Sequence, residues 1–377
     1  MRVLILSDLH IGATTGSATS DAWVSFLDWV VERSDDDAAP WRLVVLGDFL
    51  DLLHAPADVR DPLAALDAVA ARHRSTFAAL GAAVERGVQI DVVPGNHDSE
   101  LLDTDVQEHL RALVAEAAAA SPTALLAGFR IRRWFLLVPG YLYAEHGSQY
   151  HALNAVADPL APSGRWSPRL PPGAALDLLL GDWERGRRTH ALRRLLSALA
   201  RRGSAAASTG ASLEAHASES GISLRAVGDI HALGENSWAA LVRNAHAAAL
   251  GRSSFVESRQ QRAALAVHRI LTGERQSVPA YVFGHTHRAA HCALDADGTR
   301  LLCFNSGAWT NGGYEFVELS RRAGGVTARL CRWDPLLRSA IALSGPLSSA
   351  TFPAQVPELT RRRRNAGSGS AVPVARS

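Results

Sequence analysis

The sequence predicts an α/β fold that is interrupted by an inserted helical segment, and three observations support this prediction. Short apolar runs typical of buried strands alternate with longer stretches in which apolar residues recur at helical spacing. Residues 151–278 lack this alternation, and strand-like runs return only after them. The chain has 377 residues, of which 47% are hydrophobic and 20% are charged, as is typical of globular proteins with a large core.

The first 150 residues carry the alternating part of the pattern. The predicted strands are Val3–Leu6, Leu43–Leu46, Val88–Val93, Phe129–Val138 and Tyr141–Ala144, the last two joined at Pro139-Gly140. The predicted helices are Trp23–Val30, Leu63–Val84 and Val106–Ala118. Strands that alternate with helices of this length favour βαβ units and a mostly parallel sheet.

Residues 151–278 are predicted to form an inserted helical cap. The segment begins with an irregular proline-rich connector, and a Ser/Ala/Gly-rich stretch near Gly203–Ser220 is expected to be flexible. Between them, a leucine stripe that starts at Leu192 is surrounded by arginines, among them Arg187 and Arg194. Such a basic helix either binds an anionic substrate or membrane surface, or has a solvated face while its leucines pack on the core.

Strands return after the cap, so the core is predicted to comprise residues 1–150 and 279–347. The later strand-like runs are Tyr281–Phe283, Leu301–Phe304, Tyr314–Leu319 and Val326–Trp333. Polar or glycine-containing turns between them favour a meander. Residues 348–377, which include four consecutive arginines followed by Gly and Ser residues, are predicted to be a disordered tail.

Composition and charge exclude several classes of protein. Three cysteines are too few for a disulfide scaffold and lack metal-motif spacing, although Cys292 and Cys303 are candidates to face each other on neighbouring strands. The formal net charge of +2 argues against a general nucleic-acid coat protein. No apolar run reaches the roughly 18 residues of a spanning helix. Asp8 lies too early for a signal peptide, so a cytoplasmic protein is expected.

Polar residues of the metal-ligand type follow five of the predicted strands. They are Asp8 and His10 after the first strand, Asp48 after the second, Asn96-His97-Asp98 after the third, His146 after Tyr141–Ala144, and His285 and His287 after the strand that resumes beyond the cap. In open α/β sheets, ligands bind outside the carboxyl ends of the strands, so these side chains are expected to converge.

Seven of these residues supply the oxygen and imidazole ligands of a dinuclear metal site. They are Asp8, His10, Asp48, Asn96, His146, His285 and His287. Imidazole with carboxylate favours Mn, Fe, Zn or Ni over Ca or Mg. The set is too large for one ion, but if Asp48 bridges, two ions about 3.5–4 Å apart can hold a hydroxide nucleophile and a phosphoryl oxygen. Extended backbone at Asp8–His10 and His285–His287 would point alternate side chains the same way, and glycines at 47, 95 and 284 would permit tight turns.

Five blocks of the sequence carry a family resemblance. They are Asp8-x-His10, Gly47-Asp48-x-x-Asp51, Gly95-Asn96-His97-Asp98, His146-Gly147 and Gly284-His285-x-His287. In this order they resemble the signature blocks of calcineurin-like metallophosphoesterases. The resemblance covers residues 1–150 and about 279–333 and leaves the cap outside it.

The resemblance implies a four-layer αββα fold with two divalent transition-metal ions, Mn first, with Fe, Zn, Ni or Co as alternatives. By that pattern one ion is held by Asp8, His10, Asp48 and His287, and the other by Asp48, Asn96, His146 and His285. His97 would contact the scissile phosphate and protonate the leaving oxygen, with Asp98 orienting it. Asp51 is expected to support this set by hydrogen bonds, because metal ligands need such support.

Two blocks, at 47–52 and 305–309, are similar to the branch of this family that contains UDP-2,3-diacylglucosamine diphosphatases. Those enzymes also carry a helical lid before the Gly-His-x-His block. This chain departs from that branch, because the best-studied members have Arg where His97 stands here and because its insertion is longer. His97 instead matches the general phosphodiesterase pattern.

The sequence therefore predicts a phosphoesterase that hydrolyses a phosphate monoester, phosphodiester or pyrophosphate bond with a metal-bound hydroxide. Its substrate would be a phosphorylated small molecule, a nucleotide or a lipid precursor, with membrane contact through the cap as a further interaction. Three alternatives stay open: a UDP-2,3-diacylglucosamine diphosphatase-like pyrophosphatase, a nuclease of the same superfamily, and a non-catalytic scaffold on the same fold. Dispersed basic residues argue against a nuclease, and the complete ligand set argues against a scaffold. Other histidines, among them His54 and His151, match no block and are interpreted as surface or core residues.

Overall fold

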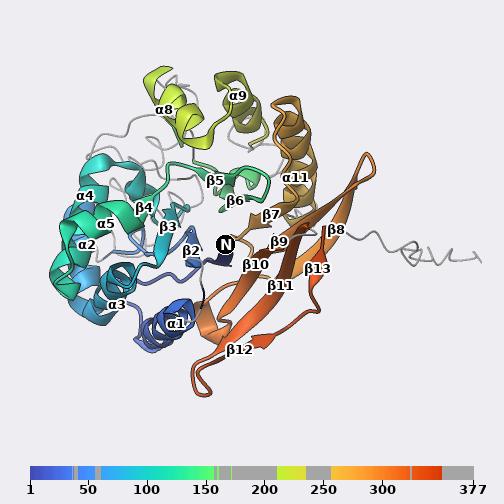
Figure 1. Cartoon of the computed structure of the whole chain (residues 1–377). Helices are drawn as coiled ribbons and strands as arrows, with labels where there is room; N and C mark the ends of the chain where they lie inside the picture. The colour runs from blue at the N-terminus through green and yellow to red at the C-terminus, as the bar shows by residue number, and fades with distance from the viewer. Residues whose placement is uncertain are drawn as a thin grey trace, which may run out of the picture.

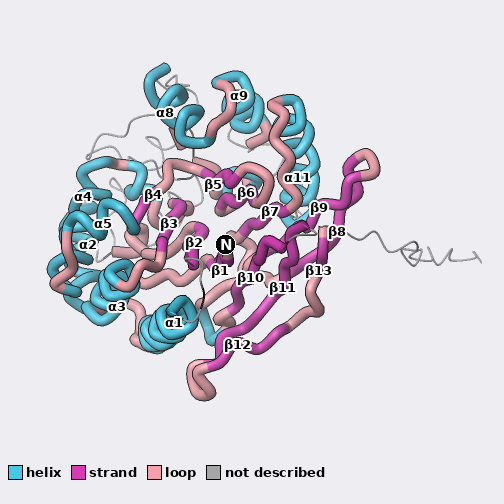
Figure 2. Tube along the Cα trace, viewed as in Figure 1, coloured by secondary structure: helices cyan, strands magenta, loops and turns pink. Residues whose placement is uncertain are grey.

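The computed structural model describes residues 1–35, 37, 41–55, 61–156, 159–160, 171, 210–234, 256–322 and 325–349. Within these ranges the fold is a mixed α/β arrangement of two sheets, with helices on the outside (Figures 1 and 2). The predicted α/β class is thereby confirmed. The arginine-rich helix expected around Leu192, most of the proposed cap and the tail beyond residue 349 lie outside the described residues.

The first sheet has eight strands in the order β12-β11-β10-β1-β2-β3-β4, with β13 paired to β11. Its parallel part consists of β1 (Arg2–Leu6), β2 (Trp41–Leu46), β3 (Gln89–Val93) and β4 (Phe129–Ile131). Its antiparallel part consists of β10 (Glu315–Arg322), β11 (Gly325–Asp334), β12 (Ser339–Ala342) and β13 (Leu347–Ser348). Leu6 is in register with Val45, and Leu46 with Val93, so the carboxyl ends of β1, β2 and β3 lie at one edge.

Helices cover the outer face of this sheet. They are α1 (Ala18–Asp35), α2 (Pro62–Arg72), α3 (Arg74–Glu85), α4 (Thr104–Ala118) and α5 (Pro122–Gly128). Their apolar faces share one buried cluster with strand residues such as Leu4 and Leu43. The prediction of a single helix over Leu63–Val84 was wrong, because the helix breaks at His73. The ring of His73 donates to the carbonyl of Gly12 at 3.0 Å and contacts Ser20 Oγ at 2.7 Å, which fixes the break.

The second sheet has the strand order β5-β6-β7-β9-β8. The strands are β5 (Phe135–Val138), β6 (Leu142–Glu145), β7 (Ala280–Phe283), β9 (Thr299–Asn305) and β8 (Ala290–Ala296). The strand predicted over Phe129–Val138 is therefore two strands, β4 and β5, in different sheets. Arg132 lies at this crossing and binds Asp91 at 2.6 Å.

The expected meander after the cap was also wrong, because β7 and β9 belong to the second sheet while β10 and β11 belong to the first. The predicted facing of two cysteines is confirmed, since Cys292 on β8 is in register with Cys303 on β9. Helix α5 and strands β8 and β12 were not predicted.

Two apolar clusters flank the second sheet. One contains Val3 and Val44 of the first sheet together with Leu142 and Val282 of the second, so these two faces pack on each other. The other contains residues of the opposite face with helices α8 (Gly210–Ser220), α9 (Leu224–Ala232) and α11 (Val256–Gly273).

Helix α8 contradicts the expected flexibility of Gly203–Ser220 for its second half, while residues 203–209 lie outside the described residues. None of the described helices is both long and apolar enough to cross a membrane.

Candidate metal centre

The loops after β1 and β2 run side by side and bring the first ligand residues together. The backbone N–H of Asp8 donates to Gly47 O at 3.1 Å, and that of His10 donates to Asp48 O at 2.9 Å. A parallel bridge between Ile11 and Leu50 continues this pairing. Asp8 and His10 therefore lie next to Asp48 because their strands are neighbours in the sheet.

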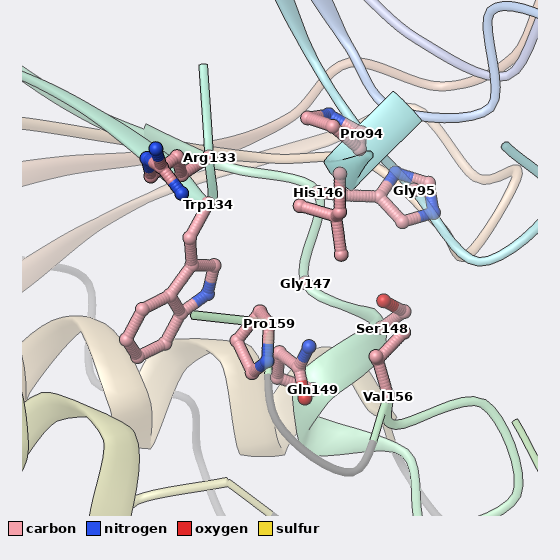
Figure 3. A pocket seen from close by; sticks show the side chains of 11 residues that line it. Pro94, Gly95, Arg133, Trp134, His146, Gly147, Ser148, Gln149, Val156 and Pro159 are labelled. Atoms are coloured by element: carbon pink, nitrogen blue, oxygen red, sulfur yellow. The ribbon is translucent and has the colours of Figure 1, made fainter. Parts of the chain in front are cut away.

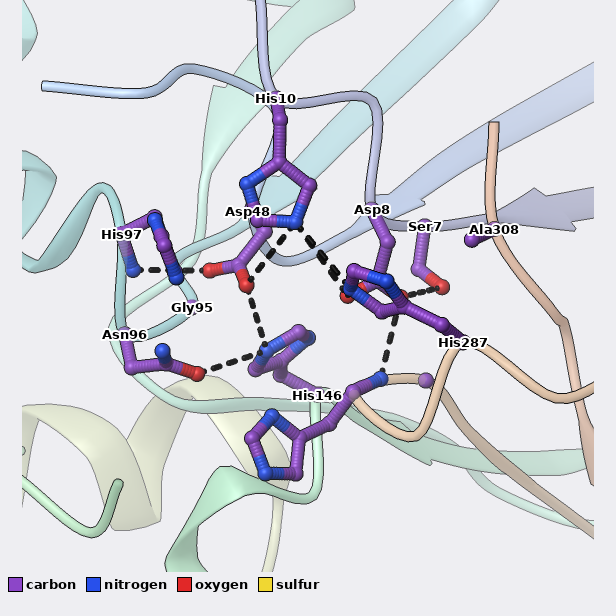
Figure 4. Close-up of polar contacts among 12 residues, drawn as sticks. Ser7, Asp8, His10, Asp48, Gly95, Asn96, His97, His146, His287 and Ala308 are labelled. Atoms are coloured by element: carbon purple, nitrogen blue, oxygen red, sulfur yellow. Dashed lines mark hydrogen bonds and ion pairs between the residues drawn. The ribbon is translucent and has the colours of Figure 1, made fainter. Parts of the chain in front are cut away.

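Two groups of side chains gather at this edge, as Figure 4 shows. In the first group Nε2 of His287 lies 3.1 Å from Oδ1 of Asp8 and 3.2 Å from Nε2 of His10. In the second group Nε2 of His146 lies 3.3 Å from Oδ2 of Asp48 and 3.2 Å from Oδ1 of Asn96.

Asp48 lies between the two groups. Its Oδ2 is 3.6 Å from Nε2 of His10 in the first group and 3.3 Å from Nε2 of His146 in the second. Asp48, His146 and His285 offer ligand atoms within 4.8 Å of one another, as do Asp8, His10 and His287. The structure thus brings together all seven residues predicted as metal ligands.

The backbone at the ligands differs from the predicted extended conformation. Asp8, His10, Asp48, His285 and His287 all have positive φ, between 48° and 71°. This left-handed region is uncommon for residues other than glycine, and strain of this kind is found at functional sites that the surrounding structure holds in place. At these five ligands the side chains converge because the chain turns sharply, not because alternate residues of a strand point the same way.

Glycines allow the loops to approach closely. At Gly47 the backbone is left-handed, with φ +84°, and an added Cβ would lie 2.2 Å from Nδ1 of His146. An added Cβ at Gly95 would lie 2.1 Å from Oδ1 of Asp48. Gly47 therefore permits the tight turn that was predicted. Gly95 is needed because a side chain at this position would clash with Asp48.

The hydrogen bonds of His146 show that this centre fits a cation. Its Nδ1 lies 2.8 Å from the carbonyl of Leu46, which can only accept, so Nδ1 carries the proton. In a neutral ring Nε2 is then a lone pair, yet it faces the oxygens of Asp48 and Asn96. Three acceptors that point at one another need a proton or a metal ion between them. Two imidazoles, a carboxylate and an amide oxygen suit a transition-metal ion.

The pKa values of three ligand residues also show how their charges interact in the centre. Burial raises the pKa of Asp48, but the charges of His146 and His10 outweigh it and hold that pKa well below its usual range. Burial lowers the pKa of His146, but the Asp48 carboxylate outweighs it and raises the pKa to about 10. Burial and the neighbouring His146 lower the pKa of His285 to about 3, so its ring is neutral.

His97 lies beside the first group and is oriented by Asp51. Its Nδ1 is 3.2 Å from Oδ1 of Asp51, and its ring meets that of His10 edge-on at 4.5 Å between centroids. Burial lowers the pKa of His97, but the hydrogen bond with Asp51 and the charge of Asp48 raise it to about 9. Asp51 also contacts His54 at 2.9 Å, and this second histidine was not predicted to be near the site.

Asp98 was expected to orient His97, and the structure gives it a different position. Its Oδ1 accepts from the backbone N–H of Gly95 at 2.6 Å, and its Oδ2 accepts from those of Phe49 and Leu50 at 2.9 and 3.2 Å. Asp98 therefore ties the loop after β3 to the loop after β2, while Asp51 contacts His97.

We expect Asp98→Asn to lower the free energy of unfolding by about 1–3 kcal/mol, because an amide N–H₂ would face one of the backbone donors and leave it unsatisfied. Urea denaturation measures this loss, with Asp28→Asn, at an exposed position of α1, as the control. Equal stability of the two variants would contradict the tying role of Asp98.

A small pocket lies beside the second group (Figure 3). Gly95 and His146 line it on the side of the metal centre, and Arg133 and Trp134 line it from the link between β4 and β5. The indole of Trp134 is fixed by donating to Oε2 of Glu145 at 3.1 Å. Among the described residues Arg133 has no ion-pair partner, whereas Arg132 binds Asp91 and Glu219.

Two further side chains that were not predicted as site residues lie against His285. They are His151 and Asn154, in the turn after His146. Their only signal in the sequence is proximity to His146, because neither belongs to a signature block. Comparison of the chain with protein-family models gives no match, and comparison with curated proteins gives no similar sequence. The function must therefore be argued from this site.

Proposed function

We propose that the protein is a dinuclear-metal phosphoesterase. The observation that carries the proposal is the position of Asp48 between two groups of imidazole and oxygen ligands. A carboxylate in this position can bridge a pair of ions about 3.5–4 Å apart. We also propose that helices α1–α5, the two sheets, and helices α8, α9 and α11 form the four layers of an αββα sandwich, as their three apolar clusters support.

Each ion would be held by four residues. Asp8, His10, Asp48 and His287 would hold one ion, and Asp48, Asn96, His146 and His285 would hold the other. Mn is the first candidate, with Fe, Zn, Ni or Co as alternatives. When bound, the ions would supply a hydroxide nucleophile at neutral pH and would stabilise charge on the phosphoryl oxygens.

The chain itself would position the leaving group. Because Asp51 holds Nδ1 of His97, the Nε2 of that ring is free to donate to an oxygen of the scissile phosphate ester. The raised pKa of His97 matches a proton donor. Asp98 keeps the His97 loop in place through its three backbone contacts.

The side of the centre that Arg133 and His146 line would face the part of the substrate that remains on the phosphoryl group. Arg133, with no ion-pair partner among the described residues, is suited to a second phosphate, because guanidinium groups bind phosphate oxygens in bidentate fashion. This favours a phosphodiester or pyrophosphate substrate over a small monoester.

We expect Arg133→Ala to raise KM for a nucleoside diphosphate sugar about 10-fold or more, as for the loss of a charged hydrogen bond. Bis(p-nitrophenyl) phosphate has a single phosphate, so its KM should change little. Steady-state kinetics with both substrates measures the difference. Arg130→Ala, at an exposed position of β4, is the control and should change neither KM. Equal KM increases for both substrates would exclude a second-phosphate contact.

The test of the proposed activity is hydrolysis of bis(p-nitrophenyl) phosphate and p-nitrophenyl phosphate by the Mn-reconstituted protein, with the chelated protein as control. Faster cleavage of the diester would support the proposal in its diesterase form, and preference for the monoester would move the substrate search to phosphatases. If two ions bind but neither ester is cleaved, UDP-2,3-diacylglucosamine is the next substrate to assay. Failure to bind a transition-metal ion would overturn the proposal in favour of a non-catalytic role.

A further inference from the structure

The ring of His285 is held by two side chains from the turn that follows His146. Nε2 of His285 lies 3.2 Å from Nδ1 of His151 and 3.2 Å from Nδ2 of Asn154. Nδ2 of Asn154 lies 2.9 Å from Nδ1 of His151. Nε2 of His285 thus contacts two side chains of this turn, which leaves Nδ1 on the opposite side of the ring.

The turn that carries these side chains is itself well fixed. The backbone N–H of His151 donates to Ser148 O at 3.0 Å, and those of Asn154 and Ala155 donate to His151 O, both at 2.8 Å. Because the turn follows directly on His146, His151 and Asn154 are attached to one proposed ligand and contact another. The His285 backbone is fixed separately, since its N–H donates to Oδ2 of Asp8 at 3.0 Å.

With the Asn154 amide oriented as in the structure, the two contacts made by Nδ1 of His151 determine where the ring protons lie, and the shorter of them is the one to Asn154. An amide nitrogen only donates, so Nδ1 of His151 accepts from Asn154 and carries no proton. Nε2 of His285 can then bond to the same Nδ1 only as a donor. In this arrangement Nε2 cannot also accept from Asn154, so the 3.2 Å separation between Nε2 of His285 and Nδ2 of Asn154 is a contact and not a hydrogen bond. The Nε2 of His285 is therefore protonated and its Nδ1 has the lone pair.

We propose that His151 is a positioning residue that holds His285 in the Nε2–H tautomer and so leaves Nδ1 for the ion shared with Asp48 and His146. The inference rests on the proposed function for the identity of that ion, but the tautomer itself does not. Hydrogen bonds to the outer nitrogen of a ligating histidine fix its ring orientation and raise its basicity. Neither His151 nor Asn154 needs to touch the substrate or the ion to have this effect.

The tautomer can be measured in the metal-free, full-length protein. Histidine ring ¹⁵N labelling and long-range ¹H–¹⁵N correlation distinguish the two neutral tautomers, and His285→Gln identifies the His285 signals by their loss. We expect His285 as Nε2–H in the wild type and a mixture of tautomers in His151→Leu. A wild-type Nδ1–H tautomer would overturn the inference, whether or not the protein binds metal.

Metal affinity provides the second readout. His151→Leu is expected to weaken binding of one of two Mn²⁺ ions by about 10- to 100-fold in a titration of the metal-free protein. His151→Gln should recover part of this loss, because its side-chain oxygen can accept from Nε2–H. His109→Leu is the control, since His109 lies on α4 and pairs with Asp67 at 2.7 Å.

Each outcome of the titration has a defined meaning. Unchanged affinity in His151→Leu would overturn the positioning role. A loss that Gln does not recover would make His151 a direct ligand, which also overturns it. Absence of Mn²⁺ binding in the wild type would count against the proposed function, while the tautomer measurement would still decide the inference.

Discussion

Asp48→Asn is expected to lower phosphoesterase turnover by at least about 10³-fold. A loss of this size is comparable to that caused by removing a group that stabilises the transition state. The substitution should also reduce the bound metal from two ions to one or fewer. The oxygen that accepts from the backbone N–H of His97 at 2.8 Å can be retained by the asparagine. The amide nitrogen would replace Oδ2, which faces both His10 and His146. The substitution would therefore remove the oxygen proposed to bridge the two ions, while the hydrogen bond from the backbone N–H of His97 is kept.

Metal content by mass spectrometry and turnover with bis(p-nitrophenyl) phosphate measure the two effects of Asp48→Asn. Asp67→Asn is the matched control, because the Asp67 side chain is exposed and pairs with His109, away from the metal centre. Circular dichroism checks that the variant folds. Full activity with two ions bound would show that Asp48 does not bridge, and the dinuclear proposal would then fail.

The expected convergence of the site could be derived from the sequence because it depends on topology alone. Buried strands such as β1 and β2 are continuous apolar runs, and parallel neighbours end at one edge of their sheet. Ligand residues placed just after such runs must therefore meet. The positions of Asp8 and Asp48 follow from this rule, although their left-handed backbone does not.

The parts that could not be predicted depend on contacts between distant segments. The break at His73 is made by Gly12 and Ser20, which lie far away in the sequence. The division of Phe129–Val138 between two sheets coincides with Arg132 and Arg133, but the sheet that each half joins depends on distant strands.

The expected role of Asp98 differs from the observed one for the same reason, whereas the supporting role expected of Asp51 agrees with its contact to His97. Both are acidic residues near His97, and the family resemblance implied that Asp98 orients it. The hydrogen bonds show instead that Asp98 accepts from backbone donors of two loops, while Asp51 reaches His97 from the neighbouring strand end. Spacing along the chain cannot distinguish a residue that ties loops together from one that orients a side chain.

His97→Ala is expected to lower turnover by about 10²–10⁴-fold, the usual contribution of general acid–base catalysis, while both metal ions stay bound. The ring contributes no ligand atom to either group of four, so its removal should leave metal content unchanged. Asp51→Ala should give a smaller loss in the same direction, because it removes the contact at Nδ1 but keeps the imidazole. Loss of metal in His97→Ala would instead make His97 a ligand.

The leaving group distinguishes proton donation by His97 from simple contact with phosphate. A nitrophenolate leaves readily without a proton, whereas an alkoxide needs one, so the loss in His97→Ala should grow as the leaving group becomes more basic. Rates for a series of phosphodiesters with leaving groups of increasing pKa would measure this dependence. A loss of constant size across the series would mean that His97 binds the phosphate and that the leaving oxygen takes its proton from elsewhere. The position of His97, held at Nδ1 by Asp51 and edge-on to His10, favours the steeper dependence.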